Sequence, residues 1–123
     1  MATPSQLIAQ PYNNATVQGA AGPYPSAAFA MPYAQANNIE VVYEYIVTPT
    51  GTSPTDSITL QGSFDNTDWV NIGAAVASLT TTAAPVAATA LYLTVAYPLL
   101  RILHTLGGTT PVYAGMYMNI YAY

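Results

Sequence analysis

The chain has 123 residues with one Arg, no Lys and five acidic residues, and its formal net charge is −4. An average soluble domain devotes roughly a quarter of its residues to Asp, Glu, Lys and Arg, whereas this chain devotes 5% to them and 52% to hydrophobic types. Because Arg101 is the single cation, nucleic-acid binding is excluded, since its affinity depends on Lys and Arg displacing counterions. The composition indicates a surface that other molecules cover.

Length and residue types set further bounds. A chain of this length forms one domain with a real core, and without cysteine it has no disulfide, thiolate metal site or thiol nucleophile. Residues 1–10 lack the basic and apolar regions of a secretory signal, so we expect cytosolic synthesis. The uncharged segment 83–100 is as long as a membrane span, but it contains Pro85 and Pro98 and lacks flanking cations. We expect a buried strand region there and no membrane contact.

The first 38 residues are rich in Ala, Pro, Asn, Gln and Tyr and carry no charge. Their prolines are spaced so that no helix runs through them, because each removes an amide donor and favours extended geometry in the preceding residue. We expect residues 1–38 to form an extended arm that orders on a surface, with a disordered tail as the alternative. Its anchors would be Tyr12, Tyr24, Phe29 and Tyr33.

Two segments in the middle of the chain alternate with the period of a β-strand. Residues 39–47 and 58–64 have this pattern, the Pro- and Gly-rich residues 49–54 separate them, and residues 65–68 form a polar turn into residues 69–72. This order predicts a β-hairpin. In residues 39–47, one face holds Ile39, Val41, Tyr43, Tyr45 and Val47 and the other holds Glu40, Val42, Glu44 and Ile46. In residues 58–64, the expected inward side chains are Ile58, Leu60 and Phe64, and the expected outward ones are Thr59, Gln61 and Ser63.

Residues 73–90 are compatible with a weak strand or a wide loop. Beyond them, residues 91–97 and 99–105 are expected strands separated by Pro98, and residues 107–111 are an expected turn. The last strand alternates most clearly, with Val112, Ala114, Met116, Met118, Ile120 and Ala122 on one face and Tyr113, Gly115, Tyr117, Asn119, Tyr121 and Tyr123 on the other.

The expected fold follows from these elements. Short strands, Gly/Pro turns and no helical periodicity predict an all-β protein, a single antiparallel β-sandwich or jelly-roll-like domain. We expect that domain to span residues 39–123, preceded by the extended N-terminal arm.

Few residues suggest chemistry. His104, the only histidine, has no Ser or acid at a recognisable motif spacing, so we interpret it as structural. Asp65 and Asp68 fit a local turn, and the alternative is a weak Ca²⁺ site that lacks the full loop pattern. Glu40 and Glu44 fit a solvated strand face, and the alternative is a glycosidase pair. We therefore expect no catalytic residue, no metal and no cofactor.

Arg101 lies within an apolar segment. A buried unpaired charge is prohibitive, so we predict that its guanidinium meets a carboxylate or backbone carbonyls, with Asp65 and Asp68 as first candidates. The alternative is an edge strand from which Arg101 points to solvent.

The tyrosines of the last strand leave three interpretations open: packing within the chain, contact with other subunits, and stacking against sugar rings. Tyrosine buries a large area while keeping a hydroxyl for hydrogen bonding, which suits interfaces. The candidate interface combines these residues with the aromatic residues of the arm: Tyr12, Tyr24, Phe29, Tyr33, Tyr113, Tyr117, Tyr121 and Tyr123.

Part of the chain resembles a known pattern. The segment Leu60-Gln-Gly-Ser-Phe-Asp-Asn-Thr-Asp-Trp-Val70, then Tyr97-Pro-Leu-Leu-Arg-Ile102 and a closing alternating strand, is similar to small accessory virion proteins of tailed bacteriophages, namely capsid decoration or cement proteins and head-fibre or adaptor modules. The resemblance covers residues 58–123 and leaves the arm unmatched. Similar turns also occur in carbohydrate-binding β-sandwiches.

The resemblance implies a β-sandwich protein, often oligomeric, that sits on a capsid lattice and reinforces it without chemistry. The implied partners are the major capsid protein or other virion proteins and further copies of the chain, a trimer among the possible forms. The implied location is the capsid exterior of the virion, after synthesis in the host cytoplasm. The alternatives are a glycan- or receptor-binding module of a phage fibre or tail, and a surface adhesin subunit.

Overall fold

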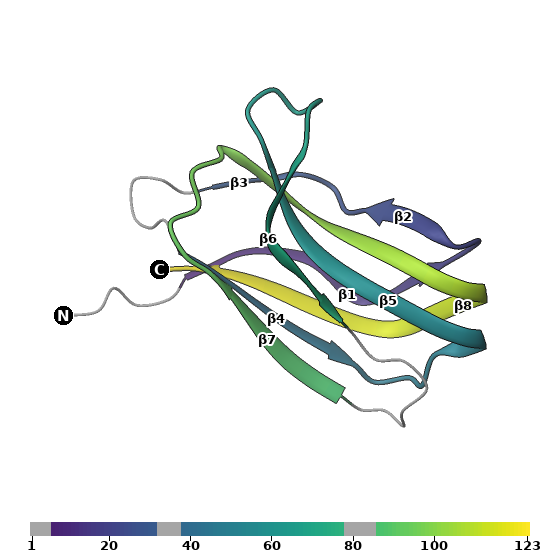
Figure 1. The fold of residues 1–123 in the computed structure, drawn as a ribbon. Helices are drawn as coiled ribbons and strands as arrows, with labels where there is room; N and C mark the ends of the chain where they lie inside the picture. The colour runs from purple at the N-terminus through teal and green to yellow at the C-terminus, as the bar shows by residue number, and fades with distance from the viewer. Residues whose placement is uncertain (1–5, 32–37, 78–85) are drawn as a thin grey trace.

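The computed structural model describes residues 6–31, 38–77 and 86–123, and all of the regular secondary structure in these ranges is β-strand (Figure 1). The paired strands are antiparallel, so the predicted all-β sandwich or jelly-roll-like fold class is confirmed. Among the described residues, no helix has the length and apolar character needed to cross a membrane. The strands are β1 (Gln6–Gln18), β2 (Gly22–Pro25), β3 (Phe29–Ala30), β4 (Ile39–Tyr45), β5 (Thr50–Ser63), β6 (Val70–Ala77), β7 (Val86–Tyr92) and β8 (Leu99–Ala122).

Strand β8 is the central strand of the fold and takes part in both layers. It has 24 residues and turns back on itself, as Figure 1 shows. Its first half pairs with β5 on one side and with β2 and β3 on the other, whereas its second half pairs with β4 and β1. Two layers result, β6-β5-β8-β2/β3 and β7-β4-β8-β1. Their facing sides enclose a core of aliphatic residues, methionines and tyrosines.

The bends of β5 and β8 lie against each other. Gly51 has φ of +111° and Gly108 has φ of +92°, a region that side chains strongly disfavour. A Cβ at Gly51 would lie 2.7 Å from the carbonyl oxygen of Thr110, and one at Gly108 would collide with that of Ser53. The expected turn at residues 107–111 is therefore wrong, because the chain bends there within one continuous strand.

The predicted hairpin of residues 58–72 is confirmed as β5 and β6. On β4 the expected shared face is confirmed for Ile39, Val41, Tyr43 and Tyr45, which are all buried. Beyond these strands the pattern fails, since Val47, expected on the face of Tyr45, is 45% exposed and Phe64, expected inward, is 72% exposed. Both follow the last residue of a strand, so the alternation no longer decides their direction.

The outer face of β5 is more covered than expected. Thr59, Gln61 and Ser63 are expected to point outward, and all three are buried. Strand β5 lies between β6 and β8, so neighbouring side chains cover it. Gln61 bonds to residues on both flanking strands.

A bulge divides the last strand. Gly115 has φ of +62°, and four residues of β8, from Tyr113 to Met116, run beside three of β1, from Ala15 to Val17. The extra residue reverses the faces, so Tyr113 is fully buried on the side of Met116. The expectation that Tyr113 shares a face with Tyr117 is therefore wrong.

The N-terminal residues that the structure describes are extended and pair with β8 of their own chain. Strands β1, β2 and β3 lie along β8, and Tyr12, Val17 and Met31 contribute buried side chains to the core. Tyr33 lies outside the described residues.

Residues 73–90, for which the sequence is compatible with a weak strand or a wide loop, contain the end of β6 and the start of β7. Residues 78–85 lie outside the described residues. Strand β7 begins earlier than the strand expected at residues 91–97 and ends at Tyr92. Just after it, Thr94 has φ of +54° and donates its amide to Asn38 Oδ1 at 3.1 Å. In the described part of the uncharged segment 83–100, the expectation of a buried strand fails for β7, which ends the order of paired strands and exposes Ala87, Thr89 and Leu91.

Candidate functional site

A polar cluster lies buried between the two layers. Asp56 of β5 and His104 of β8 have fully buried side chains, and Nδ1 of His104 is 2.6 Å from Oδ2 of Asp56. The hydroxyl of Tyr45 on β4 donates to the same carboxylate oxygen at 3.0 Å. The cluster therefore links β8 and β5 to β4 of the opposite layer.

Two tyrosines of the expected interface enclose this cluster. Tyr12 meets the His104 ring edge-on, with 4.9 Å between ring centroids, and Tyr113 packs edge-on against Tyr45 at 5.7 Å. Burial, with a smaller contribution from the charge of Asp56, raises the pKa of both Tyr12 and Tyr113 to about 12. Both side chains are core components in the described chain and are not available on its surface.

The cluster holds the same pair of groups as a catalytic acid–imidazole dyad, but in a different setting. The pair is sealed from solvent, and Nε2 of His104 has no hydrogen-bond partner among the described residues. A substrate would have to enter a packed core to reach it. The geometry suits a hydrogen-bonded cluster that joins the two layers, which agrees with the structural interpretation of His104. Its partner could not be read from the sequence, because Asp56 is 48 positions away in a Pro-rich segment.

The other tyrosines of the last strand lie on the outer side of the β7-β4-β8-β1 sheet. Glu40 is directly opposite Tyr121, and Glu44 is directly opposite Tyr117. We call these four residues the tyrosine–glutamate face. All are at least partly exposed, so this part of the expected interface is accessible on the chain.

The tyrosine–glutamate face is hollowed at one end. The hollow has a volume of about 340 Å³ and is lined by Val42, Tyr43, Glu44, Ala87, Tyr117 and Asn119. Beside it, Gln10 donates from Nε2 to Asn119 Oδ1 at 2.9 Å and so joins β1 to this surface. A phenol ring, a carboxylate and an amide thus line one shallow surface.

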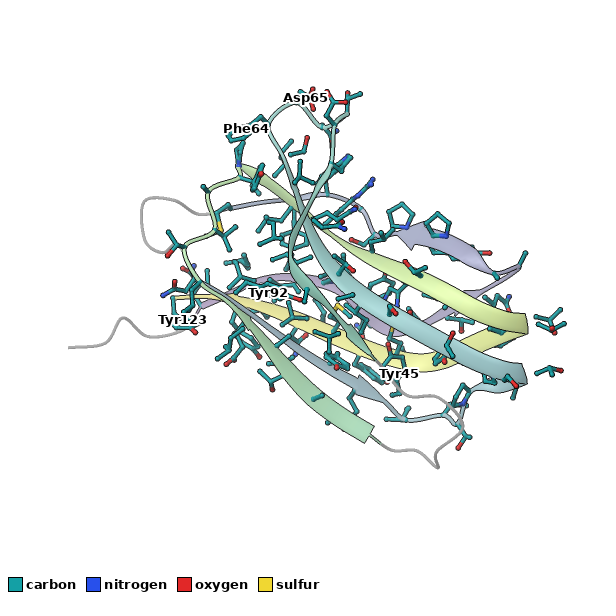
Figure 2. All side chains as sticks on the ribbon, in the orientation of Figure 1. Tyr45, Phe64, Asp65, Tyr92 and Tyr123 are labelled. Carbon is teal, nitrogen blue, oxygen red and sulfur yellow. The ribbon has the colours of Figure 1, made fainter. Side chains whose placement is uncertain are left out.

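The remaining candidate interface residues lie elsewhere. Tyr24 on β2 and Phe29 on β3 are partly buried against the core, and the Tyr24 hydroxyl donates to the carbonyl of Ala20 at 2.7 Å. Tyr123 ends the chain beside β4, where its backbone exchanges two hydrogen bonds with Asn38. Figure 2 shows Tyr123 far from the β5–β6 loop that carries Phe64.

Arg101 is held by neutral partners. Its Nε donates to Gln61 Oε1 at 2.8 Å, and the guanidinium lies 4.3 Å from the ring centroid of Trp69. Gln61 in turn donates to Asn71 Oδ1 at 2.9 Å. Partial burial lowers the pKa of Arg101. The described residues form no ion pair between Arg101 and Asp65 or Asp68, so the expected pairing is not what positions this cation.

Asp65 shapes the β5–β6 loop. Its Oδ1 accepts the backbone amides of Thr67 and Asp68 at 2.9 and 2.8 Å and the hydroxyl of Ser63 at 3.0 Å. These hydrogen bonds, the amide of Asp68 first, lower the pKa of Asp65, whereas the bond to Asp65 and its charge raise the pKa of Asp68. The local-turn interpretation accounts for both residues. No group of three potential metal-ligating side chains occurs in the described part of the chain.

Phe64 stands at the start of the same loop and is largely exposed. Its ring packs against that of Tyr97, with 5.0 Å between the ring centroids. Figure 2 shows Phe64 and Asp65 together at the end of the molecule where this loop projects. Further exposed large apolar side chains are Leu7, Ile46, Val47, Val70, Leu91 and Leu93.

Comparisons with known proteins give weak similarities. A chain from the structure of infectious bursal disease virus, Gx strain, is 11% identical with a TM-score of 0.48, and the match covers 98% of this chain and 32% of that one. A chain from the Gt strain of the same virus is 9% identical with a TM-score of 0.46, over 97% and 32%. This chain therefore spans about a third of their length. No protein-family model and no curated protein matches.

Proposed function

We propose that this chain is a non-enzymatic structural protein of a virion that binds the capsid surface and stabilises the shell, as a decoration or cement protein does. Its partners in this proposal are the major capsid protein or other virion proteins, and its location is the capsid exterior. The proposal rests on the chain's own surface and on the resemblance of residues 58–123 described above.

The observation that carries the proposal is the near absence of charge on the surface. Asp56 is buried, so the ionic side chains left for the surface are Glu40, Glu44, Asp65, Asp68 and Arg101. Large apolar side chains are exposed on several strands and loops of the same surface. Exposed apolar side chains on a surface with so few charges suit a subunit that its neighbours cover.

The buried position of His104 supports a role without catalysis. The imidazole and Asp56 are enclosed between the layers, where the hydrogen bond from Tyr45 joins them to β4 of the opposite layer. The acids outside the core lie on the tyrosine–glutamate face and in the turn that Asp65 shapes. Each of these arrangements has a structural or recognition role that needs no bond-breaking step.

The hollow on the tyrosine–glutamate face favours one alternative function, binding of a glycan or receptor by a fibre or tail module or by an adhesin subunit. Tyr117 supplies a ring for stacking, and Glu44 and Asn119 supply hydrogen-bonding groups. A glycan array probed with the purified chain tests this alternative. Binding that Tyr117→Ala abolishes would favour it.

The leading proposal is tested with capsids of the virus that encodes the chain, prepared from a mutant that lacks it. Electron micrographs of these capsids with and without added chain should show regular extra density on the outer surface. The chain should reach saturation on the capsid at a fixed ratio to the shell protein. A chain that leaves capsids bare and binds oligosaccharides on the array would overturn the proposal.

A further inference from the structure

The two layers of the sandwich have open edges, and the described edge strands differ in how they are protected. An open edge presents unpaired backbone groups that can pair with another chain, and prolines and bulges block such pairing. Strand β1 contains Pro11 and a left-handed Asn14, β2 contains Pro23 and Pro25, and β6 contains Gly73 with φ of +70°. Each of these three edge strands therefore has a proline or an irregular residue that hinders pairing with another strand.

Strand β7 has none of these features. Its seven residues contain no proline and no charge, and none of them has a positive φ. They pair with β4 in one uninterrupted register, from Ile39 opposite Tyr92 to Tyr45 opposite Val86. Strand β4 pairs with one side of β7, and β7 ends the order of paired strands. On the other side β6 comes near β7 without pairing with it, so the backbone edge there is not used by a described strand and can pair with another chain.

The exposed side chains of β7 suit pairing with an identical strand. Ala87, Thr89 and Leu91 point to the outer face, and Leu91 is 58% exposed. An antiparallel pair centred on Thr89 places Thr89 opposite its own copy and Leu91 opposite Ala87, so that a large side chain meets a small one. Cross-strand Thr–Thr and size-matched apolar pairs stabilise antiparallel sheets.

We propose that two copies of this chain associate through β7, antiparallel and centred on Thr89, so that their β7-β4-β8-β1 sheets join into one continuous sheet. A two-fold axis makes the contact self-complementary and closes it after two subunits. The exposed Leu93, which directly follows β7, adds apolar surface near the junction. This association does not depend on the proposed function of the chain.

Charge permits the pairing with a second copy. The nearest acids, Glu40 and Glu44, lie one strand inward on β4. Across the joined sheet the two β4 strands would be three strand spacings apart, about 14 Å. At this separation physiological salt screens the repulsion between the copies, since the Debye length is about 8 Å.

Cross-linking tests the register, because the chain contains no cysteine of its own. A Thr89→Cys chain should form covalent dimers with a short bis-maleimide, since directly opposite residues have Cβ atoms about 5 Å apart. Thr16→Cys is the matched control, an exposed threonine on the protected edge strand β1. Equal cross-linking of the two variants would overturn the proposal.

Sedimentation velocity of the full-length chain over a range of concentrations tests the association itself. The unmodified chain should form dimers, Thr89→Lys should weaken them at least ten-fold, and Thr16→Lys should leave them unchanged. Circular dichroism of each variant confirms that it is folded. A chain that stays monomeric at all concentrations, or an oligomer that Thr89→Lys does not weaken, would refute the pairing through β7.

Discussion

Asp56 and His104 meet between the two layers, with 2.6 Å from the carboxylate oxygen Oδ2 to the imidazole nitrogen Nδ1. They come from β5 and β8, and Tyr45 of the opposite layer donates to the same oxygen. The contact lies buried beside a core of apolar groups and aromatic rings. A polar contact in that position makes the packing of the layers depend on both residues.

Removing one partner of this pair should destabilise the protein strongly. In Asp56→Ala the buried imidazole loses its partner, and leaving a buried polar or charged group unpaired costs about 2–5 kcal/mol. The free energy of unfolding in urea measures this, with the fluorescence of Trp69, the single tryptophan, as the signal. Glu44→Gln is the exposed control and should change stability little. A loss below about 1 kcal/mol in Asp56→Ala would show that the pair does not hold the layers together.

Alkaline pH should unfold the chain through its buried tyrosines. The pKa values of Tyr12 and Tyr113 are raised to about 12 in the folded state, against about 10 in an unfolded chain. Below pH 10 both phenols are protonated in the folded and in the unfolded state, so the stability of the fold does not depend on their titration. As pH rises from 10 to 12 the unfolded state releases protons first, so stability falls by up to about 1.4 kcal/mol per pH unit for each tyrosine.

Spectrophotometric titration at the phenolate absorbance band checks this prediction. Of the 11 tyrosines, the late-titrating group should include Tyr12 and Tyr113, and Tyr12→Phe and Tyr113→Phe should each remove one late step. A single transition near pH 10 for all phenols, with the fold intact, would contradict the buried positions of both rings.

Gly115 should tolerate no side chain. Its φ is +62°, and a Cβ there would lie 2.6 Å from Ile46 Cγ1 and 2.7 Å from Val47 Cγ2. Gly115→Ala should therefore cost about 2–4 kcal/mol, from left-handed strain and overpacking together. Thermal unfolding measures this loss. Gly22→Ala is the matched control, since Gly22 has φ of +153° but a Cβ added there would meet no heavy atom within 4 Å, and it should lose less. Equal losses would mean that the bulge does not pack against residues 46 and 47.

Arg101 should stabilise the outer side of β5 through Gln61 and Trp69. Arg101→Met removes a charged hydrogen bond and a cation–π contact, and we expect a loss of about 1–3 kcal/mol because the site is only partly buried. Arg101→Lys should recover part of the loss, since an ammonium keeps the charge over the ring but not the planar donor geometry. Urea unfolding gives the stabilities, and the emission maximum of Trp69 reports the contact. Unchanged emission in Arg101→Met would exclude the stacking.

Local patterns were sufficient for part of this fold. The alternation of Ile39, Val41, Tyr43 and Tyr45 predicted a half-buried strand, and the polar turn at residues 65–68 predicted the hairpin of β5 and β6. In both places the structure depends mainly on residues that are close together in the sequence. A period-2 pattern predicts burial well where this is so.

The remaining features depend on contacts between distant residues. The bulge at Gly115 exchanges the faces of β8 and buries Tyr113, and a regular alternation contains no sign of it. Asp56 and His104 are 48 residues apart, and Arg101 and Gln61 are 40 apart. Only the register of β5 against β8 brings these pairs together. The bend at Gly108 likewise requires the matching bend at Gly51, which lies on another strand.

Heat disruption of capsids tests the central claim, that this charge-poor chain stabilises a viral shell by covering it. Capsids from a mutant virus lacking the chain are heated with and without the purified protein, and release of the packaged genome is followed with a nucleic-acid dye. Release at a higher temperature with the chain bound than without it is the result predicted here. Release at the same temperature with saturating, folded chain would contradict the proposed function.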